Sequence, residues 1–189
     1  MSPMRRAALV LLVSLSSLAT AACTPEHTSD LPTTLASISA PPFASEDDAL
    51  IAATESVTSF YQMGATILAE GGIDGERLND FATPPMVAIE MSGFNELRDK
   101  GLVYRGQPVM TSVILQSYLP DALEGIGVVT AYVCQDGSSV TLEDANGSSL
   151  VSPLRTDLTE FQITFDLVDE GSPRLLVSSK TPWGGGGVC

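Results

Sequence analysis

The chain has 189 residues, with 23 acidic and 9 basic side chains and a formal net charge of -14 at pH 7. Nucleic acid and anionic lipid headgroups both bind to cationic surfaces, so this acidity argues against either as a direct partner. The one histidine, His27, lies near the N-terminus. This position argues against a Ser-His-Asp or Cys-His triad, and against a histidine-rich zinc site, in the rest of the chain. We therefore expect no metal and no cofactor.

The N-terminal stretch has the pattern of a secretory signal. Two arginines precede residues 7–18, which are apolar apart from three serines, and residues 19–22 are small. The apolar run is too short to span a membrane easily. One interpretation is a plain signal peptide, cut after Ala21 or Ala22, that leaves the following cysteine as an ordinary residue.

A second interpretation is a lipoprotein signal. Residues 19–23 read Ala-Thr-Ala-Ala-Cys, with Thr20 where such signals usually have leucine. They resemble the bacterial lipoprotein signal, in which diacylglycerol is added to the cysteine and the chain is cut just before it. The resemblance implies a signal peptide over residues 1–22 and a Cys23 that carries diacylglycerol and a further acyl chain such as palmitate. Several acyl chains make a stable anchor, whereas one chain is marginal.

Cysteine counting favours the lipoprotein interpretation. The chain has three cysteines, Cys23, Cys134 and Cys189. An exported protein with three thiols would carry an odd reactive one, whereas lipid on Cys23 leaves Cys134 and Cys189 to pair. We predict this disulfide, with two free cysteines as the alternative. Removal of residues 1–22 takes away two arginines and no acidic residue, so the formal charge becomes -14 minus 2, or -16.

Residues 23–45 are predicted to form a disordered tether that starts at the lipidated cysteine. The segment holds four prolines, several serines and threonines, and no apolar period. A chain of this composition cannot bury enough apolar surface to fold, so we expect it to be extended and mobile. It would lift a single domain, residues 46–189, off the membrane.

Three helices are predicted at the start of this domain. Ser45 and Asp48 resemble a capping box, and apolar residues then recur at helical spacing until Gly71-Gly72. Residues 74–82 form a short second helix, and Pro84-Pro85 opens a third that ends before a glycine at position 101. We assign the apolar face of the third helix to Met86, Ile89, Phe94 and Leu97.

After the third helix the hydrophobic period changes to two, which indicates strands. The predicted strands cover residues 102–118, with a bend near Gly106-Gln107-Pro108, and then 126–134, 139–143, 158–168 and 174–179. Helices followed by antiparallel strands predict an α+β fold. About three N-terminal helices would pack on a curved antiparallel sheet of four to six strands.

Several stretches of the domain together match a known pattern. They are Ser59-Phe60-Tyr61, a short helix ahead of Ala82-Thr83, the run over residues 97–106, the strand exit with its cysteine over residues 132–136, and the glycine-rich end at Val188-Cys189. With these features, residues 46–189 resemble the nuclear transport factor 2-like superfamily, the SnoaL-like and cystatin-like group of cone-shaped domains. More narrowly, they resemble small actinobacterial lipoproteins that carry this domain.

The resemblance implies a pocket between sheet and helices, in which some members place Asp and Tyr for proton transfer. A carboxyl group in an apolar pocket has a raised pKa and can act as a base. The pocket candidates here are Tyr61, Asp80, Tyr104 and Tyr132. Two of them also fit other interpretations, Tyr61 as a core residue with its hydroxyl near the rim and Asp80 as helix surface. The superfamily also pairs through its open sheet face, which implies a homodimer.

Two further features fit more than one interpretation. Asp136, Glu143 and Asp144 are near one another in sequence, but their spacing does not match an EF-hand, and acidic hairpin tips are usually solvated. Trp183 precedes four glycines and is interpreted either as an exposed recognition residue or as a lid on the end of the domain.

These features predict an extracytoplasmic lipoprotein, tethered to the cell membrane by Cys23, whose domain is a non-catalytic binding or scaffold module of the cell envelope. Its partner would be an envelope protein or a small apolar ligand. The alternative is a small enzyme that uses an Asp/Tyr pair in the pocket for proton transfer or hydrolysis. We assign no catalytic residue.

Overall fold

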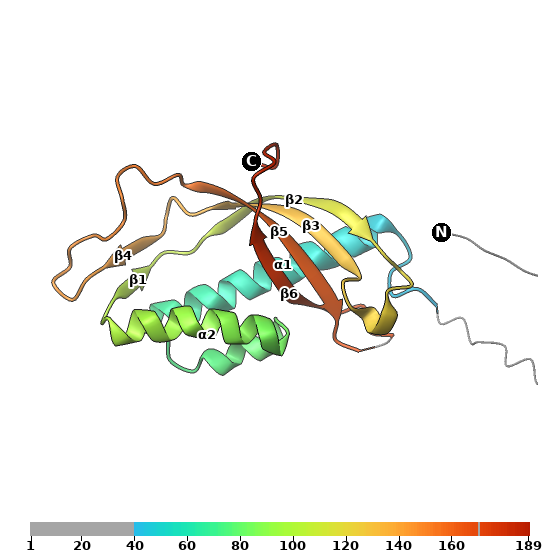
Figure 1. Ribbon diagram of the computed structural model, residues 1–189, viewed down its shortest axis with the longest axis horizontal. Helices are drawn as coiled ribbons and strands as arrows, with labels where there is room; N and C mark the ends of the chain where they lie inside the picture. The colour runs from blue at the N-terminus through green and yellow to red at the C-terminus, as the bar shows by residue number, and fades with distance from the viewer. Residues whose placement is uncertain (1–39, 170) are drawn as a thin grey trace, which may run out of the picture. The chain divides into compact units, whose positions relative to one another are not determined.

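A computed structural model describes residues 40–169 and 171–189. The signal peptide, Cys23 and the tether before Ala40 lie outside these residues. The described part confirms the predicted α+β fold, because its helices cover one face of a curved antiparallel sheet (Figure 1). In the described part, no helix combines the length and the apolar character that crossing a membrane requires.

Helix α1, Glu46–Ala69, begins and ends where the sequence predicts. The side chain of Ser45 accepts a hydrogen bond from the backbone N–H of Asp48 at 3.1 Å, and three acidic residues occupy the first turn, where they interact favourably with the helix dipole. Gly71 follows the helix in the left-handed region, with φ of 80°. The buried face of α1 consists of Ala49, Ala53, Val57, Phe60, Ala65 and Ile67.

The second predicted helix is a 3₁₀ helix, η1, over Gly75–Asp80, and the third is α2, Pro84–Asp99, with proline in its first turn. The η1 segment lies very close to α2. A Cβ atom on Gly75 would lie 2.2 Å from the sulfur of Met91 and 2.9 Å from the ring of Phe94, so a larger residue here would have to displace these side chains.

The main sheet has four antiparallel strands in the order β2-β3-β5-β6. Their bounds are Val109–Tyr118, Val129–Asp136, Leu158–Leu167 and Leu175–Pro182. A short 3₁₀ turn, η2, Leu123–Gly125, lies between β2 and β3. The inner face packs on α1 through Val129, Ala131, Val133, Ile163, Phe165 and Val177. A side chain at every second residue therefore enters one core.

The predicted strand over residues 102–118 is wrong as a single strand. It divides into β1, Val103–Arg105, and β2, and β1 pairs with β4, Thr141–Glu143, in a separate two-stranded sheet. The break falls at the predicted bend. Gly106 has φ of 84°, and a Cβ there would lie 2.0 Å from the carbonyl oxygen of Ser139, so this crossing requires glycine.

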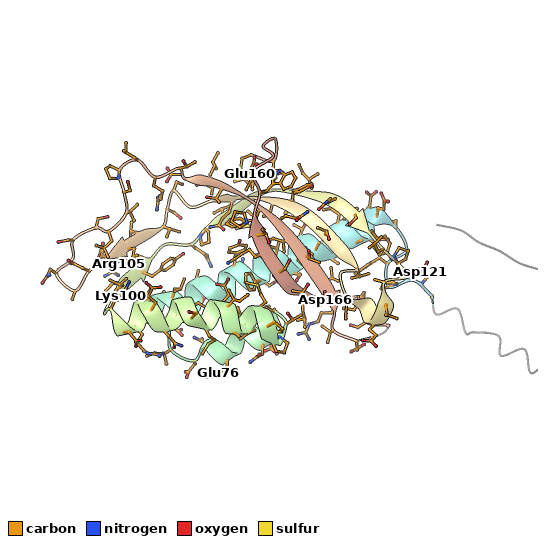
Figure 2. All side chains as sticks on the ribbon, in the orientation of Figure 1. Glu76, Lys100, Arg105, Asp121, Glu160 and Asp166 are labelled. Carbon is orange, nitrogen blue, oxygen red and sulfur yellow. A yellow bond between two sulfur atoms is a disulfide. The ribbon has the colours of Figure 1, made fainter. Side chains whose placement is uncertain are left out.

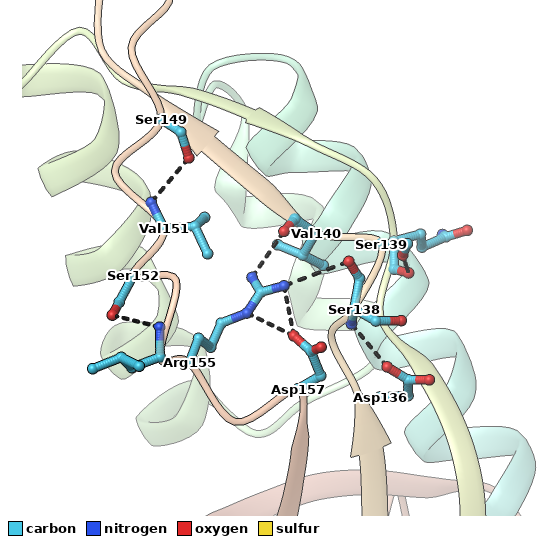
Figure 3. A network of polar contacts seen from close by, with 11 residues as sticks. Asp136, Ser138, Ser139, Val140, Ser149, Val151, Ser152, Arg155 and Asp157 are labelled. Atoms are coloured by element: carbon cyan, nitrogen blue, oxygen red, sulfur yellow. Dashed lines mark hydrogen bonds and ion pairs between the residues drawn. The ribbon is translucent and has the colours of Figure 1, made fainter.

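The turn after β3 is held by a network around Arg155 (Figure 3). The guanidinium donates to the carbonyl oxygens of Val140 at 2.8 Å and Ser138 at 3.4 Å, and it pairs with the carboxylate of Asp157 at 2.8 Å. These contacts tie the turn between β3 and β4 to the segment that leads into β5.

The C-terminus is fastened to the outer face of the sheet. Cys134 and Cys189 form the predicted disulfide. The carboxylate of Glu160, next to Cys134 on the neighbouring strand, accepts hydrogen bonds from the backbone N–H groups of Val188 and Cys189, each at 2.9 Å (Figure 2). The bonds from Cys189 and then Val188 lower the pKa of Glu160, so the carboxylate stays ionised and keeps these bonds.

We expect replacement of both Cys134 and Cys189 by serine to lower the free energy of unfolding by up to about 4 kcal/mol. The disulfide joins positions 55 residues apart, and its loss frees that loop in the unfolded chain. Urea denaturation of the double variant measures the change. Reductant should produce the same shift in the wild-type protein and none in the variant. A wild-type midpoint that reductant leaves unchanged would contradict the role of the bridge.

Candidate binding site

A cavity of about 250 Å³ lies between the two long helices and the inner side of the strands. Aromatic and aliphatic side chains form most of its wall, and three polar side chains, those of Glu90, Gln135 and Lys180, join them. Its lining consists of Phe60, Tyr61, Gly64, Ala65, Leu68, Glu90, Phe94, Tyr104, Pro108, Gln135, Phe161 and Lys180. Apolar walls with a few polar groups are the usual composition of small-molecule sites.

An ion pair between Lys180 of β6 and Glu90 of α2 lies in this cavity. The ammonium nitrogen is 2.5 Å from a carboxylate oxygen, and each side chain is 22% exposed. The same nitrogen lies 5.6 Å from the ring centroids of both Phe60 and Tyr61. A cation at this distance interacts favourably with the face of an aromatic ring. The charges of the cavity are therefore paired and held against its aromatic wall.

A β-bulge brings Lys180 into the cavity. On β6, Leu175 and Val177 point into the core, so strict alternation would turn Lys180 outward. The register between β5 and β6 shifts after the pair Phe165 and Val177, and Lys180 then lies opposite Ile163, a core residue. One extra residue in a strand reverses the facing of every later side chain, and here it directs a lysine inward.

Tyr61 is the polar group of the cavity that lacks a partner. Within the described residues, its hydroxyl oxygen is the one buried side-chain polar atom without a hydrogen bond. A buried hydroxyl left unpaired costs about 1–3 kcal/mol. Burial, and next the negative charge of Glu90, raise the pKa of Tyr61 well above its ordinary range. The group therefore stays protonated, and its O–H is available as a hydrogen-bond donor.

Of the four pocket candidates from the sequence, two line this cavity together. Tyr61 does so from α1 and Tyr104 from β1, and burial raises the pKa of Tyr104 as well. The hydroxyl of Tyr61 is buried, which corrects the expectation that it lies near the rim.

The other two candidates lie elsewhere. Asp80 is exposed at the end of η1, beside a different cavity of about 650 Å³, where its carbonyl oxygen accepts a hydrogen bond from Arg174 at 2.6 Å. Tyr132 lies between the core residues Ala131 and Val133 and so projects from the outer face. The structure therefore does not bring Asp80 and Tyr61 together as an acid–base pair.

Trp183 packs on the outer face of the sheet. Its ring centroid is 4.5 Å from that of Tyr132, and a Cβ on Gly185 would lie 2.3 Å from the indole. The glycine-rich end of the chain thus runs close over the tryptophan, which is half-buried. The sheet therefore separates Trp183 from the inner cavity.

Sequence reasoning missed the two charged residues of the cavity. Glu90 lies four residues after Met86 and four before Phe94, both of which are buried, so an acidic residue on the apolar face of the helix was the available signal. Ile89, which we assigned to that face, is 64% exposed. Lys180 had no comparable signal, because its direction depends on the bulge.

The acidic residues near β3 and β4 are used in turns. The carboxylate of Asp136 accepts from the N–H of Ser138 (Figure 3). The carboxylate of Asp144 accepts from two N–H groups of its own turn. Glu143 lies 3.6 Å from Arg105. Among residues 40–169 and 171–189, no group of three acidic, cysteine or histidine side chains is arranged to hold a metal ion.

No model of a protein family matches the chain, and no curated protein matches it either. Two solved structures are similar. The intermembrane space region of the chloroplast protein ARC6 is 15% identical, with a TM-score of 0.47 over 72% of this chain and 97% of that one. A de novo designed β-sheet protein is 17% identical, with a TM-score of 0.31 over 75% and 92%. Similarity this distant carries no argument about function.

We expect the wild-type protein to lose more stability at alkaline pH than the variant Tyr61→Phe. The raised pKa of folded Tyr61 gives a stabilisation that is present below about pH 10, the ordinary tyrosine pKa, and is lost as the pH rises toward the folded value. Urea denaturation between about pH 8 and pH 11 measures this difference. Tyr132→Phe, on the other face, serves as the matched control. Equal alkaline losses in wild type and Tyr61→Phe would contradict the assignment.

Proposed function

We propose that this protein is a lipoprotein of the cell envelope, anchored through Cys23, whose domain binds a small and largely apolar ligand in the inner cavity. The secretory pattern of residues 1–22 and the small residues before Cys23 support the anchor. The pairing of Cys134 with Cys189 supports it, because these two cysteines are joined to each other and not to Cys23. We also propose that the domain is related to the nuclear transport factor 2-like superfamily, which its sequence resembles.

The unpaired hydroxyl of Tyr61 carries the proposal for the cavity. A ligand with a hydrogen-bond acceptor would satisfy this donor, and its binding would remove the cost of leaving the hydroxyl unpaired. The aromatic walls favour a planar or cyclic body. A volume of about 250 Å³ lies just below the usual range of ligand sites, so we infer a ligand of roughly one ring.

Binding explains the cavity better than catalysis does. A protonated tyrosine with a raised pKa donates a hydrogen bond but does not abstract a proton. Glu90, the one carboxylate of the lining, forms an ion pair with Lys180 rather than standing free in an apolar environment. Asp80, the partner that the enzyme alternative required, lies beside another cavity. These groups therefore favour the binding of a molecule over proton transfer.

A matched pair of fluorinated probes tests the cavity. We expect 4-fluoroacetophenone, which has a carbonyl acceptor, to bind the wild-type protein more tightly than 4-fluoroethylbenzene, which has a similar shape and no acceptor. Tyr61→Phe should weaken binding of the ketone by about tenfold, the effect of one hydrogen bond of about 1.4 kcal/mol, and leave the hydrocarbon unaffected. Fluorine NMR line broadening measures both affinities.

Tyr132→Phe provides the control for this experiment. It removes a tyrosine hydroxyl from the outer face, away from the cavity, and should leave both affinities unchanged. The binding-cavity proposal would be wrong if neither probe bound the wild-type protein, or if the two tyrosine variants lost equal affinity for the ketone.

Intact mass tests the anchor. We expect protein extracted from membranes to begin at Cys23, to carry a diacylglyceryl adduct with a further acyl chain there, and to show a two-hydrogen deficit that reductant removes. Cys23→Ser should release the protein from the membrane fraction while leaving the disulfide in place. An unlipidated wild-type chain that begins near Ala22 would overturn the anchor.

A further inference from the structure

The loop between β2 and β3 exposes three large apolar side chains. Leu119 is 54% exposed, Leu123 83% and Ile126 63%, and we call these three residues the apolar tip. Single exposed apolar residues are ordinary on protein surfaces. Here three fall within eight residues of one loop. Exposed apolar surface that is concentrated in one place marks contact with another apolar phase.

The backbone of this loop is firmly attached to the domain. A Cβ on Gly125 would lie 2.8 Å from the side chain of Leu167, so the loop packs closely on the end of β5. The N–H of Gly127 donates to the carboxylate of Asp166 at 2.8 Å (Figure 2). Glu124 takes the left-handed conformation with φ of 54°, which is uncommon for a side chain other than glycine. The loop is therefore held in a defined shape that leaves the apolar tip outside.

The chain that comes from Cys23 enters the domain beside the apolar tip. The hydroxyl of Tyr118, the last residue of β2, accepts from the N–H of Phe43 at 3.1 Å and donates to its carbonyl oxygen at 2.9 Å. The two rings are 5.7 Å apart. Tyr118 directly precedes Leu119, so the entry point and the tip share one end of the domain. Figure 1 shows β4 and the loop that follows it at the other end.

The length of chain before the domain limits how far the tip can be from the anchor. From Cys23 to Ala40 there are 40 minus 23, or 17, residue steps. A fully extended chain of this length reaches about 60 Å at most. An anchored Cys23 therefore keeps the entry point of the domain within about 60 Å of the membrane, which raises the effective concentration of the tip at the surface.

We propose that the apolar tip inserts into the boundary between the headgroups and the acyl chains of the membrane that holds the anchor. This inference rests on the proposed lipid anchor. Asp121 and Glu124 lie on the same loop, and residues 119–127 contain no basic side chain. The contact therefore comes from burial of apolar surface and not from attraction to anionic headgroups. It fixes the domain end-on, with the β1–β4 end away from the bilayer.

A tryptophan placed at the tip tests the insertion in the full lipidated protein. Trp183 is the one tryptophan of the chain, so W183F provides a silent background. L123W in this background, reconstituted in vesicles of phosphatidylcholine with brominated acyl chains, should shift its emission to the blue and lose intensity to the bromine. The matched control is L154W, because Leu154 is 91% exposed in the loop between β4 and β5. Its emission should not change.

Additional variants and outcomes separate this inference from the anchor. Replacement of Leu119 and Ile126 by serine should reduce the quenching of L123W. If L123W floats with the vesicles but is quenched no more than L154W, the insertion is wrong and the anchor stands. If the protein does not float with the vesicles, both are wrong. An emission that shifts only when isolated cell envelope protein is added would assign the tip to a protein partner and overturn the insertion.

Discussion

The packing of α1 along the inner face of the sheet is the contact on which the rest of the domain depends. Val57 and Ile67 of α1 have no exposed surface, and neither do Val133 and Phe165 of the sheet, which belong to the same core. No polar or charged residue is fully buried in the described part. The cavity lies where this apolar packing gives way to Tyr61 and the ion pair from α2 and β6, so its polar groups border the core without entering it.

Irregular positions in the strands determine what each face of the domain presents. The bulge between β5 and β6 directs Lys180 to the cavity, and the break at Gly106 separates β1 from the main sheet and places Tyr104 on the cavity wall. Regular alternation does the opposite for Cys134, which stays outside and pairs with the C-terminus. Departures from the two-residue alternation thus place the polar groups of the cavity. Regular alternation places Cys134 on the outer face, where it forms the disulfide.

The inner cavity, the fastened C-terminus and the apolar tip use separate parts of the molecule. The cavity has a paired charge and one unpaired donor, the outer face holds the disulfide and Glu160, and the tip lies where the chain from Cys23 enters. This separation suits a tethered binding module. A ligand in the cavity would not compete with the proposed contact between the tip and the membrane, because no residue of the tip lines the cavity.

The sequence alone determined the helix caps, the strand period and the bend at Gly106, because capping, alternation and glycine conformation act between near neighbours. It also determined the pairing of Cys134 with Cys189, because that pairing follows from the number of cysteines. The resemblance to cone-shaped domains, and not such near-neighbour effects, named Tyr61 and Tyr104 among the pocket candidates. Only the tertiary structure decided that Lys180 faces inward, that Glu90 meets it, and that Asp80 and Tyr132 lie elsewhere. The physical reason is that strand register and helix rotation are settled by packing over the whole core, and one bulge reverses the direction of each side chain that follows it.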